Sequence, residues 1–246
     1  GSSDDFPPDG GEFTILSRDL LVPNRFIEEG IEAVDGYGAP EPARAEQLME
    51  RRRRGFYDLA GVTHYLRERG APFADLTREA TLVGGASLYA STTAMPRAFV
   101  VQRAVVVDDA AALAAIEEPS LGQPFRHTAF LADGAPREGA PCDSEVIRQP
   151  AGLSAAAYEV HSCSDGVLVM TDSYFPGWTA TIDGVETPLH RADYAFRAID
   201  VPQGTHQVKL EYWPRSFSWG LALSLLSMLA LCLPVFRREP RGRRAP

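Results

Sequence analysis

The residues best suited to binding chemistry gather in the stretch YFPGWTATIDG, residues 174–184. Tyr174, Phe175 and Trp178 could stack on the apolar faces of sugar rings, and the Pro-Gly pair between them could form a turn that exposes them. The same rings could instead form a packed corner of a β-sheet. Because Trp178 begins an alternating apolar run, we expect it to point inward, which favours the structural interpretation.

Polar residues around the same segment could contact an anionic or glycan ligand. Arginine suits bidentate contact with phosphate, whereas surface ion pairing is the simpler explanation for such a group. Two arginines and two of the aromatic residues make up the candidate substrate-binding set. The polar group is Asp172, His190, Arg191, Asp193 and Arg197, and the candidate set is Tyr174, Trp178, Arg191 and Arg197.

No combination of residues predicts catalysis by this chain. The five histidines are scattered, and no glycine-rich phosphate loop follows a predicted strand. The three cysteines, Cys142, Cys163 and Cys232, lack zinc-ligand spacing, so no metal site is expected. No cofactor of another kind is expected either. Cys142 and Cys163 could form a disulfide in an oxidising compartment, or could remain separate thiols.

The charge balance argues against one class of partner. The 246 residues carry a formal net charge of −9, which is unfavourable for binding to a nucleic-acid backbone. The internal basic run from Arg51 to Arg54 follows a helical stretch and is interpreted as a solvated helix face or helix end. With 45% hydrophobic residues, the chain is long and apolar enough for one or two packed domains.

A C-terminal segment predicts a transmembrane helix. Residues 217–236, FSWGLALSLLSMLALCLPVF, contain no charged side chain, and a helix of this length spans about 30 Å, the thickness of a hydrocarbon core. Tyr212, Trp213 and Trp219 suit the membrane interface at one end. The basic run RREPRGRR at the other end predicts a cytoplasmic tail, which would place residues 1–215 outside the cytoplasm.

The rest of the chain predicts a mainly β protein with a small α/β region before the β domain. Short runs rich in Val, Leu, Tyr and Phe, separated by Gly, Pro and Asp, are typical of an antiparallel β-sandwich, here of a jelly-roll-like kind. The N-terminal residues are rich in Gly, Asp, Pro and Ser. The predicted order is a flexible linker (1–13), a small extracytoplasmic α/β region (14–80), the β-sandwich (81–215), the transmembrane helix (216–236) and the basic tail (237–246).

Turn and cap residues predict local elements of the β domain. Asp108 is a suitable N-cap for a helix over residues 108–118. Asp183-Gly184 is the strongest hairpin signal in the chain. Two more hairpins are predicted, one around Ser164-Asp165-Gly166 and one around Pro202-Gln203-Gly204.

Two segments carry a family resemblance. DSYFPGWTATIDG (172–184) and HRADYAFRAIDVPQGTHQVKLEYWPRSFSWGLALSL (190–225) resemble the C-terminal end of the YfhO family of bacterial polytopic membrane proteins. The family pattern joins Y-x-P-G-W-x-A-x-x-D-G to N-Y-A-F-R-x-V-x-V-P-x-G-x-H-x-V and a final transmembrane helix. Asp193 stands where the family has a small polar residue, and weaker similarities extend the likeness over most of residues 20–236.

This family is similar to integral-membrane glycosyltransferases of the GT-C type. The resemblance implies an enzyme that moves a sugar from a polyprenyl-phosphate carrier to an extracytoplasmic acceptor, such as a cell-envelope polymer. The acidic catalytic residue of such enzymes lies in an early loop that has no counterpart in this chain. The resemblance therefore implies that any chemistry is carried by residues upstream of these.

The sequence thus leads to two hypotheses. Without an export signal, the chain is interpreted as the C-terminal piece of a larger membrane protein, or as the product of an incomplete gene. The leading hypothesis is a non-catalytic, extracytoplasmic accessory domain that contacts the lipid bilayer and helps to position a lipid-linked sugar or the glycan or polymer acceptor. The alternative is a structural, interaction or carbohydrate-binding module held by a single membrane helix.

Overall fold

The protein is mainly β, as the sequence predicts. The computed structural model describes residues 42–51, 53–67, 71, 73–82, 85–117, 124–152 and 154–236, and the side chains of the last helix as far as residue 230. The predicted linker, the first part of the α/β region and the basic tail lie outside these residues.

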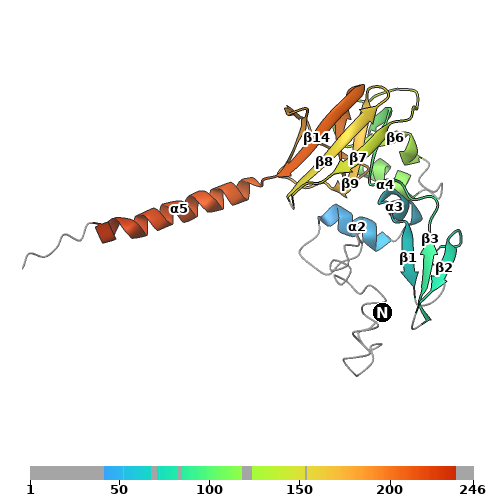
Figure 1. Ribbon diagram of the computed structural model, residues 1–246, viewed down its shortest axis with the longest axis horizontal. Helices are drawn as coiled ribbons and strands as arrows, with labels where there is room; N and C mark the ends of the chain where they lie inside the picture. The colour runs from blue at the N-terminus through green and yellow to red at the C-terminus, as the bar shows by residue number, and fades with distance from the viewer. Residues whose placement is uncertain are drawn as a thin grey trace, which may run out of the picture.

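Two larger sheets form the body of the molecule (Figure 1). The five-stranded sheet has the order β11-β10-β14-β8-β7, and the six-stranded sheet has the order β4-β9-β13-β12-β6-β5. The strands of the first sheet are β7 (Glu145–Gln149), β8 (Ala155–Ser162), β10 (Trp178–Ile182), β11 (Val185–Thr187) and β14 (Gly204–Tyr212). Those of the second are β4 (Ala98–Val101), β5 (Arg103–Val106), β6 (Thr128–Leu131), β9 (Gly166–Ser173), β12 (His190–Ala192) and β13 (Phe196–Val201).

The two sheets share one apolar core. Val208 and Leu210 of β14 pack in a single cluster with Leu168 of β9 and Ile199 of β13, and every one of these side chains is buried. On the opposite face of β9, Val167 and Val169 join a second cluster with residues of β5, β6 and β12. The first part of strand β9 is therefore buried on both faces, which explains the apolar run from Val167 to Met170.

The pairing of the strands corrects part of the predicted architecture. The described pairings are antiparallel except that of β5 with β6, which is parallel, so the prediction of a wholly antiparallel sandwich is wrong at this edge. The jelly-roll-like arrangement is not confirmed. The parallel pair is possible because α4 (Asp109–Glu117) supplies the crossover between its two strands.

Two of the three predicted hairpins are wrong. β8 and β9, on either side of residues 164–165, lie in different sheets, and so do β13 and β14 on either side of residues 202–203. Both turns carry the chain between the sheets. The hairpin at Asp183-Gly184 is confirmed, since β10 pairs with β11 in register Ile182 to Val185, and Asp183 adopts the positive φ that such a two-residue turn requires.

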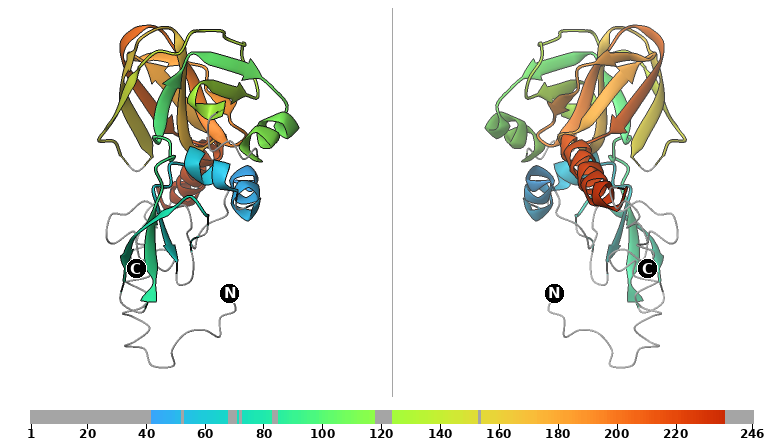
Figure 2. Two further views of the ribbon diagram at one scale, coloured as in Figure 1. Left: turned by 90° about the vertical axis from the view of Figure 1, so that its right-hand side faces the viewer. Right: turned by 90° about the vertical axis from the view of Figure 1, so that its left-hand side faces the viewer.

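Short helices and a small sheet lie at one end of this body (Figures 1 and 2). The helices are α2 (Ala43–Arg51), α3 (Arg54–Leu59), α4 and the 3-10 turn η3 (Pro124–Arg126). The small sheet has the order β1-β3-β2, with β1 (His64–Arg67), β2 (Thr77–Thr81) and β3 (Ser87–Ala90). The predicted border between residues 80 and 81 falls inside this sheet, and Asp108 caps α4 by accepting the Ala111 N–H at 2.8 Å, as predicted.

The last element, α5 (Arg215–Phe236), extends away from the rest of the molecule (Figure 1). The helix predicted for this segment is therefore present. Among the residues that the structure describes, no helix is long and apolar enough to cross a membrane. The transmembrane part of the prediction is accordingly not confirmed by the structure.

Cys142 and Cys163 form a disulfide, with a Cα–Cα distance of 6.2 Å. The bridge ties the long segment after β6 to the turn between β8 and β9, and hence to both sheets. This result selects one of the two alternatives that the sequence left open.

Removing the disulfide should destabilise the domain. Replacing Cys142 and Cys163 together by serine should lower the free energy of unfolding by about 2–3 kcal/mol, because the unfolded chain regains the freedom of the closed loop. Urea unfolding of the purified chain measures this change. Dithiothreitol should lower the stability of the unsubstituted chain by the same amount and leave the double variant unaffected, and an equal effect of the reductant on both chains would contradict the prediction.

Candidate functional site

Trp178 lies at the end of the five-stranded sheet that leads into α5. It is half-buried, packs against the shared core and pairs in register with Tyr212, whose ring centroid is 5.3 Å from its own. The guanidinium carbon of Arg197 lies 3.9 Å from the centre of the indole ring, on its face. One ring of the YFPGW stretch is therefore built into the sheet, and it supports an arginine from the other sheet.

The Pro176-Gly177 turn holds the start of α5 in place. Gly177 has a φ of +110°, and its carbonyl accepts the backbone N–H of Trp213 at 2.8 Å. A Cβ atom at this position would lie 3.0 Å from the Cα of Pro214 and 3.1 Å from the ring of Tyr212. The turn thus fits closely against the junction of β14 and α5, which only glycine permits.

Asp172 is shared by two arginines beside this turn. Its Oδ1 accepts from Arg97 Nη2 at 2.8 Å, and its Oδ2 lies 3.8 Å from Arg197 Nη2. Arg197 is buried and also donates through Nε to the Ser173 carbonyl at 3.1 Å. Burial lowers the pKa of Arg197, although Asp172 opposes this change. Within the described residues, Arg197 Nη1 has no hydrogen-bond partner.

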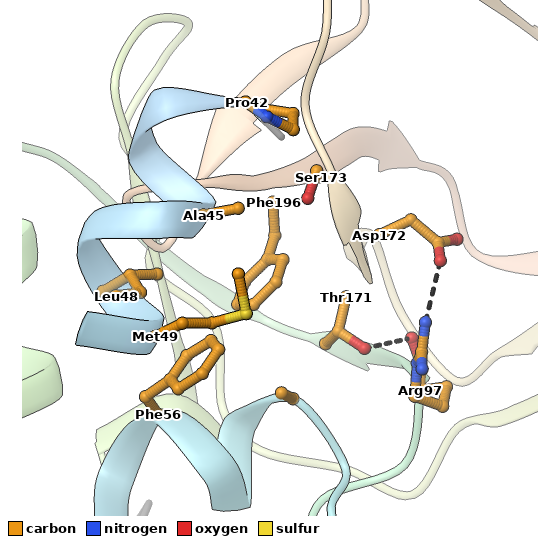
Figure 3. A pocket seen from close by; sticks show the side chains of 11 residues that line it. Pro42, Ala45, Leu48, Met49, Phe56, Arg97, Thr171, Asp172, Ser173 and Phe196 are labelled. Atoms are coloured by element: carbon orange, nitrogen blue, oxygen red, sulfur yellow. Dashed lines mark hydrogen bonds and ion pairs between the residues drawn. The ribbon is translucent and has the colours of Figure 1, made fainter. Parts of the chain in front are cut away.

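A cavity of about 280 Å³ opens on the other side of Asp172, between α2 and β9 (Figure 3). One wall is polar and carries the Arg97–Asp172 pair (Figure 3). The opposite wall is apolar and comes from α2, α3 and the start of β13. The lining residues are Pro42, Ala45, Leu48, Met49, Phe56, Ala60, Arg97, Thr171, Asp172, Ser173 and Phe196. Such a cavity suits a ligand with one polar and one apolar side.

The four candidate binding residues do not form one site. Trp178 and Arg197 are in contact, and Tyr174 is half-buried, with its backbone N–H donating to the Ala195 carbonyl at 2.7 Å. Arg191 instead donates to Asp109 Oδ1 at 2.7 Å and to the Tyr194 carbonyl at 2.8 Å. Nη2 of Arg191 thus helps to pack α4 onto the sheet, and Nη1 holds the turn between β12 and β13.

The ion pair of Arg191 belongs to a network that fixes the helices. Asp109 Oδ2 also accepts from Arg44 of α2 at 2.6 Å, and these two arginines hold the pKa of Asp109 below its usual range. The Tyr194 hydroxyl donates to Gln47 on the same helix. His190 is separate from this network, since its Nδ1 lies 2.6 Å from Asp133. Ion pairing, the simpler explanation, accounts for the contacts of Arg191 and His190, although both side chains are mostly buried rather than at the surface.

Asp193 is the most deeply buried carboxyl group near these strands. Its Oδ1 accepts the Phe130 N–H at 2.9 Å, while Oδ2 has no partner among the described residues, and the side chain is fully buried. This burial raises the pKa of Asp193 from 3.8 to about 7. Below about pH 7 the folded protein therefore favours the protonated acid.

Replacing Asp193 by asparagine should stabilise the protein in a pH-dependent way. Because the folded pKa lies above the unfolded one, the folded state binds more protons between pH 3.8 and about 7. The unsubstituted chain should accordingly lose stability as the pH rises through this window, whereas Asp193→Asn should not. Urea unfolding should show little difference between the two at pH 4 and an advantage of about 1–3 kcal/mol for the variant at pH 8. An advantage that is the same at both pH values would contradict the prediction.

Sequence reasoning placed Asp172 and Trp178 near Arg197 but missed Arg97, which shares Asp172 with Arg197. Arg97 lies in an apolar run, and nothing in its spacing relative to Asp172 indicates that strands β4 and β9 are neighbours. The interpretation of the basic run as solvated is also wrong for Arg54, whose side chain is only 11% exposed and lies beside Asp58 and between the rings of Tyr65 and Phe73. The aromatic residues that follow the run were the available signal for this burial.

The fold and site define a mainly β domain joined through a fixed junction to an apolar helix. The family described as bacterial membrane protein YfhO matches residues 154–224, from the start of β8 into α5. The uncharacterized protein YfhO of Bacillus subtilis (strain 168) is 28% identical over 83 residues, which cover 34% of this chain and 10% of that protein. The resemblance to the YfhO family is thus confirmed over this region. No solved structure matches the chain.

Proposed function

We propose that this chain is the membrane-bound, extracytoplasmic accessory domain of a glycosyltransferase-like membrane protein of the YfhO family, and that it is not itself catalytic. The observation that carries the proposal is the junction between β14 and α5. The close fit of Gly177 against Pro214 and its hydrogen bond to Trp213 hold the β domain in a fixed relation to an apolar helix. A domain attached in this way can present a surface at a defined height above a membrane.

The exposed side chains of α5 support insertion into the bilayer. Leu223, Leu226, Met228 and Leu229 lie around the helix and are each more than half exposed to water. Transferring one such side chain to an apolar environment is worth about 1.5–3 kcal/mol. The basic run that follows the helix in the sequence supports a cytoplasmic location for the tail.

The disulfide supports the extracytoplasmic location of the β domain. Disulfides such as Cys142–Cys163 persist in oxidising compartments and are rare in the cytoplasm. This location is the one at which a lipid-linked sugar would be transferred to a cell-envelope polymer. The chain covers a tenth of the length of its relative, so the transfer itself is proposed for the whole protein.

A structural module without a ligand of its own is the second candidate. Trp178 is half-buried under Arg197, and Arg191 is engaged with Asp109, so both act in packing. The cavity beside Asp172 favours the positioning role instead, because it offers a polar and an apolar wall to an acceptor or carrier. The two candidates differ in whether the placement of the β domain matters for sugar transfer.

Loosening the junction tests this difference. Inserting a short Gly-Ser segment between Pro214 and Arg215 of the full-length protein should leave both parts folded but free to move. If the domain positions a substrate, incorporation of radiolabelled hexose into the cell envelope should fall several-fold at an unchanged level of protein in the membrane. The same insertion between Asp183 and Gly184, at the far end of β10, is the matched control. Equal incorporation with both insertions would favour the structural module, and no incorporation by the unsubstituted protein would refute the transferase.

A further inference from the structure

Exposed aromatic side chains cluster around the junction of β14 and α5. Phe175 is 47% exposed, Trp213 61%, Phe217 51% and Trp219 71%. These four residues are called the junction patch. Groups of exposed apolar side chains often mark an interaction surface, whereas single exposed ones are normal. Two of the four precede α5 in the sequence, so the patch is more than the apolar surface of that helix.

Phe175 is tied to the helix by the turn that carries it. Its ring centroid lies 6.4 Å from that of Tyr212, which in turn packs on Trp178. Two residues later, Gly177 contacts Pro214 directly before the first turn of α5. These contacts hold the turn against the end of β14 and against the residue that precedes α5.

The polar atom of Trp213 is already satisfied within the protein. Its indole N–H donates to Ser218 Oγ at 2.9 Å, and its ring packs edge-on against Phe217 at a centroid distance of 4.9 Å. The ring can thus enter a less polar environment without leaving a donor unpaired. Arg215, which is exposed between these two residues, can meet a phosphate group at the same level.

We propose that the junction patch lies in the headgroup and glycerol layer of the bilayer, so that Phe175 makes a second membrane contact beside α5. This inference rests on the proposed insertion of α5. Aromatic side chains favour this layer. The Pro176-Gly177 turn holds Phe175 close to the start of α5. With two contacts, the β domain keeps a fixed tilt relative to the membrane, which one helix alone would leave free.

Collision of reagents with spin labels tests the contact. The full chain carrying Cys232→Ala, which leaves the disulfide intact, is labelled at Phe175→Cys, Val185→Cys or Leu225→Cys. The protein is reconstituted into vesicles of equal parts phosphatidylethanolamine and phosphatidylglycerol. Oxygen concentrates in lipid and a nickel chelate stays in water, so the ratio of the two collision rates reports the surroundings of each label.

Val185 is the matched control for Phe175. It is an exposed apolar residue, 71% accessible, at the start of β11, where it pairs with Ile182 at the end of β10 that lies away from the junction. Leu225 lies in α5 and reports whether the helix is inserted at all. We expect the oxygen-to-nickel ratio to be several-fold higher at positions 175 and 225 than at position 185.

Each other outcome has a distinct meaning. A lipid-like ratio at 225 with equal, water-like ratios at 175 and 185 would overturn the second contact and leave the insertion of α5 intact. Water-like ratios at all three positions would refute the insertion and the contact together. If another protein, rather than lipid, covers the junction patch in the cell, the oxygen-to-nickel ratio at position 175 should likewise be low in vesicles. That result would overturn the proposal.

Discussion

Replacing Gly177 by alanine should lower the free energy of unfolding by about 2–5 kcal/mol. At a φ of +110° an L-residue is strained, which costs about 1–2 kcal/mol or more. The added Cβ would also lie 3.0 Å from the Cα of Pro214, where backbone must move to make room, at a further cost of about 1–3 kcal/mol. The substitution should therefore disturb the junction on which the proposed function depends.

Gly184 is the control that separates strain from contact. It has a φ of +82° in the confirmed hairpin, but nothing lies within 4 Å of the position its Cβ would occupy. Gly184→Ala should accordingly cost about 1 kcal/mol, from strain alone. Urea unfolding of both variants in the same detergent gives the comparison, and equal losses would show that the contact with Pro214 contributes nothing.

The junction also explains why the YFPGW stretch has its composition. Trp178 is at once the first inward residue of β10, the neighbour of Tyr212 and the support of Arg197. Gly177 lets the turn approach Pro214, and Phe175 remains at the tip. One short stretch thus connects the core, the polar cluster at Asp172 and the proposed membrane contact. A substitution in any of these three places can therefore alter the position of α5.

Local signals predicted the local elements correctly. The Asp108 cap and the Asp183-Gly184 turn act over a few residues, and both elements have the predicted form. The inward orientation of Trp178 followed from alternation in the same way. Such features depend on backbone conformation and on the period of the strand, which the sequence states directly.

The failed predictions concern which strands become neighbours. The turns at 164–165 and 202–203 have hairpin composition, but the strands on either side are in different sheets. β4 and β13 occupy the two edges of β9, so β9 cannot also pair with β8. Local composition does not encode this choice of partners. For the same reason the Arg97–Asp172 pair could not be predicted, because it depends on the pairing of β4 with β9.

Arg54 shows how tertiary contacts override a charge pattern. Its run of arginines indicated a solvated face, but in the structure its guanidinium donates to Tyr65, Ser91 and Thr93 and pairs with Asp58 at 3.2 Å. Desolvation raises the pKa of Asp58 even though Arg54 opposes it, so burying this pair is costly in itself. The contacts connect α3 to the small sheet.

Replacing Asp58 by alanine should therefore destabilise the protein by about 3–5 kcal/mol, since it leaves the buried charge of Arg54 without its buried partner. Asp75, 3.1 Å from the same guanidinium but 38% exposed, provides the comparison, because Asp58 is fully buried. Asp75→Ala should cost about 1 kcal/mol or less. Thermal or urea unfolding distinguishes them, and equal effects would contradict the argument. Replacing Arg54 by methionine together with Asp58 by leucine should recover most of the loss, because the cost arises from the unpaired charge rather than from the missing ion pair.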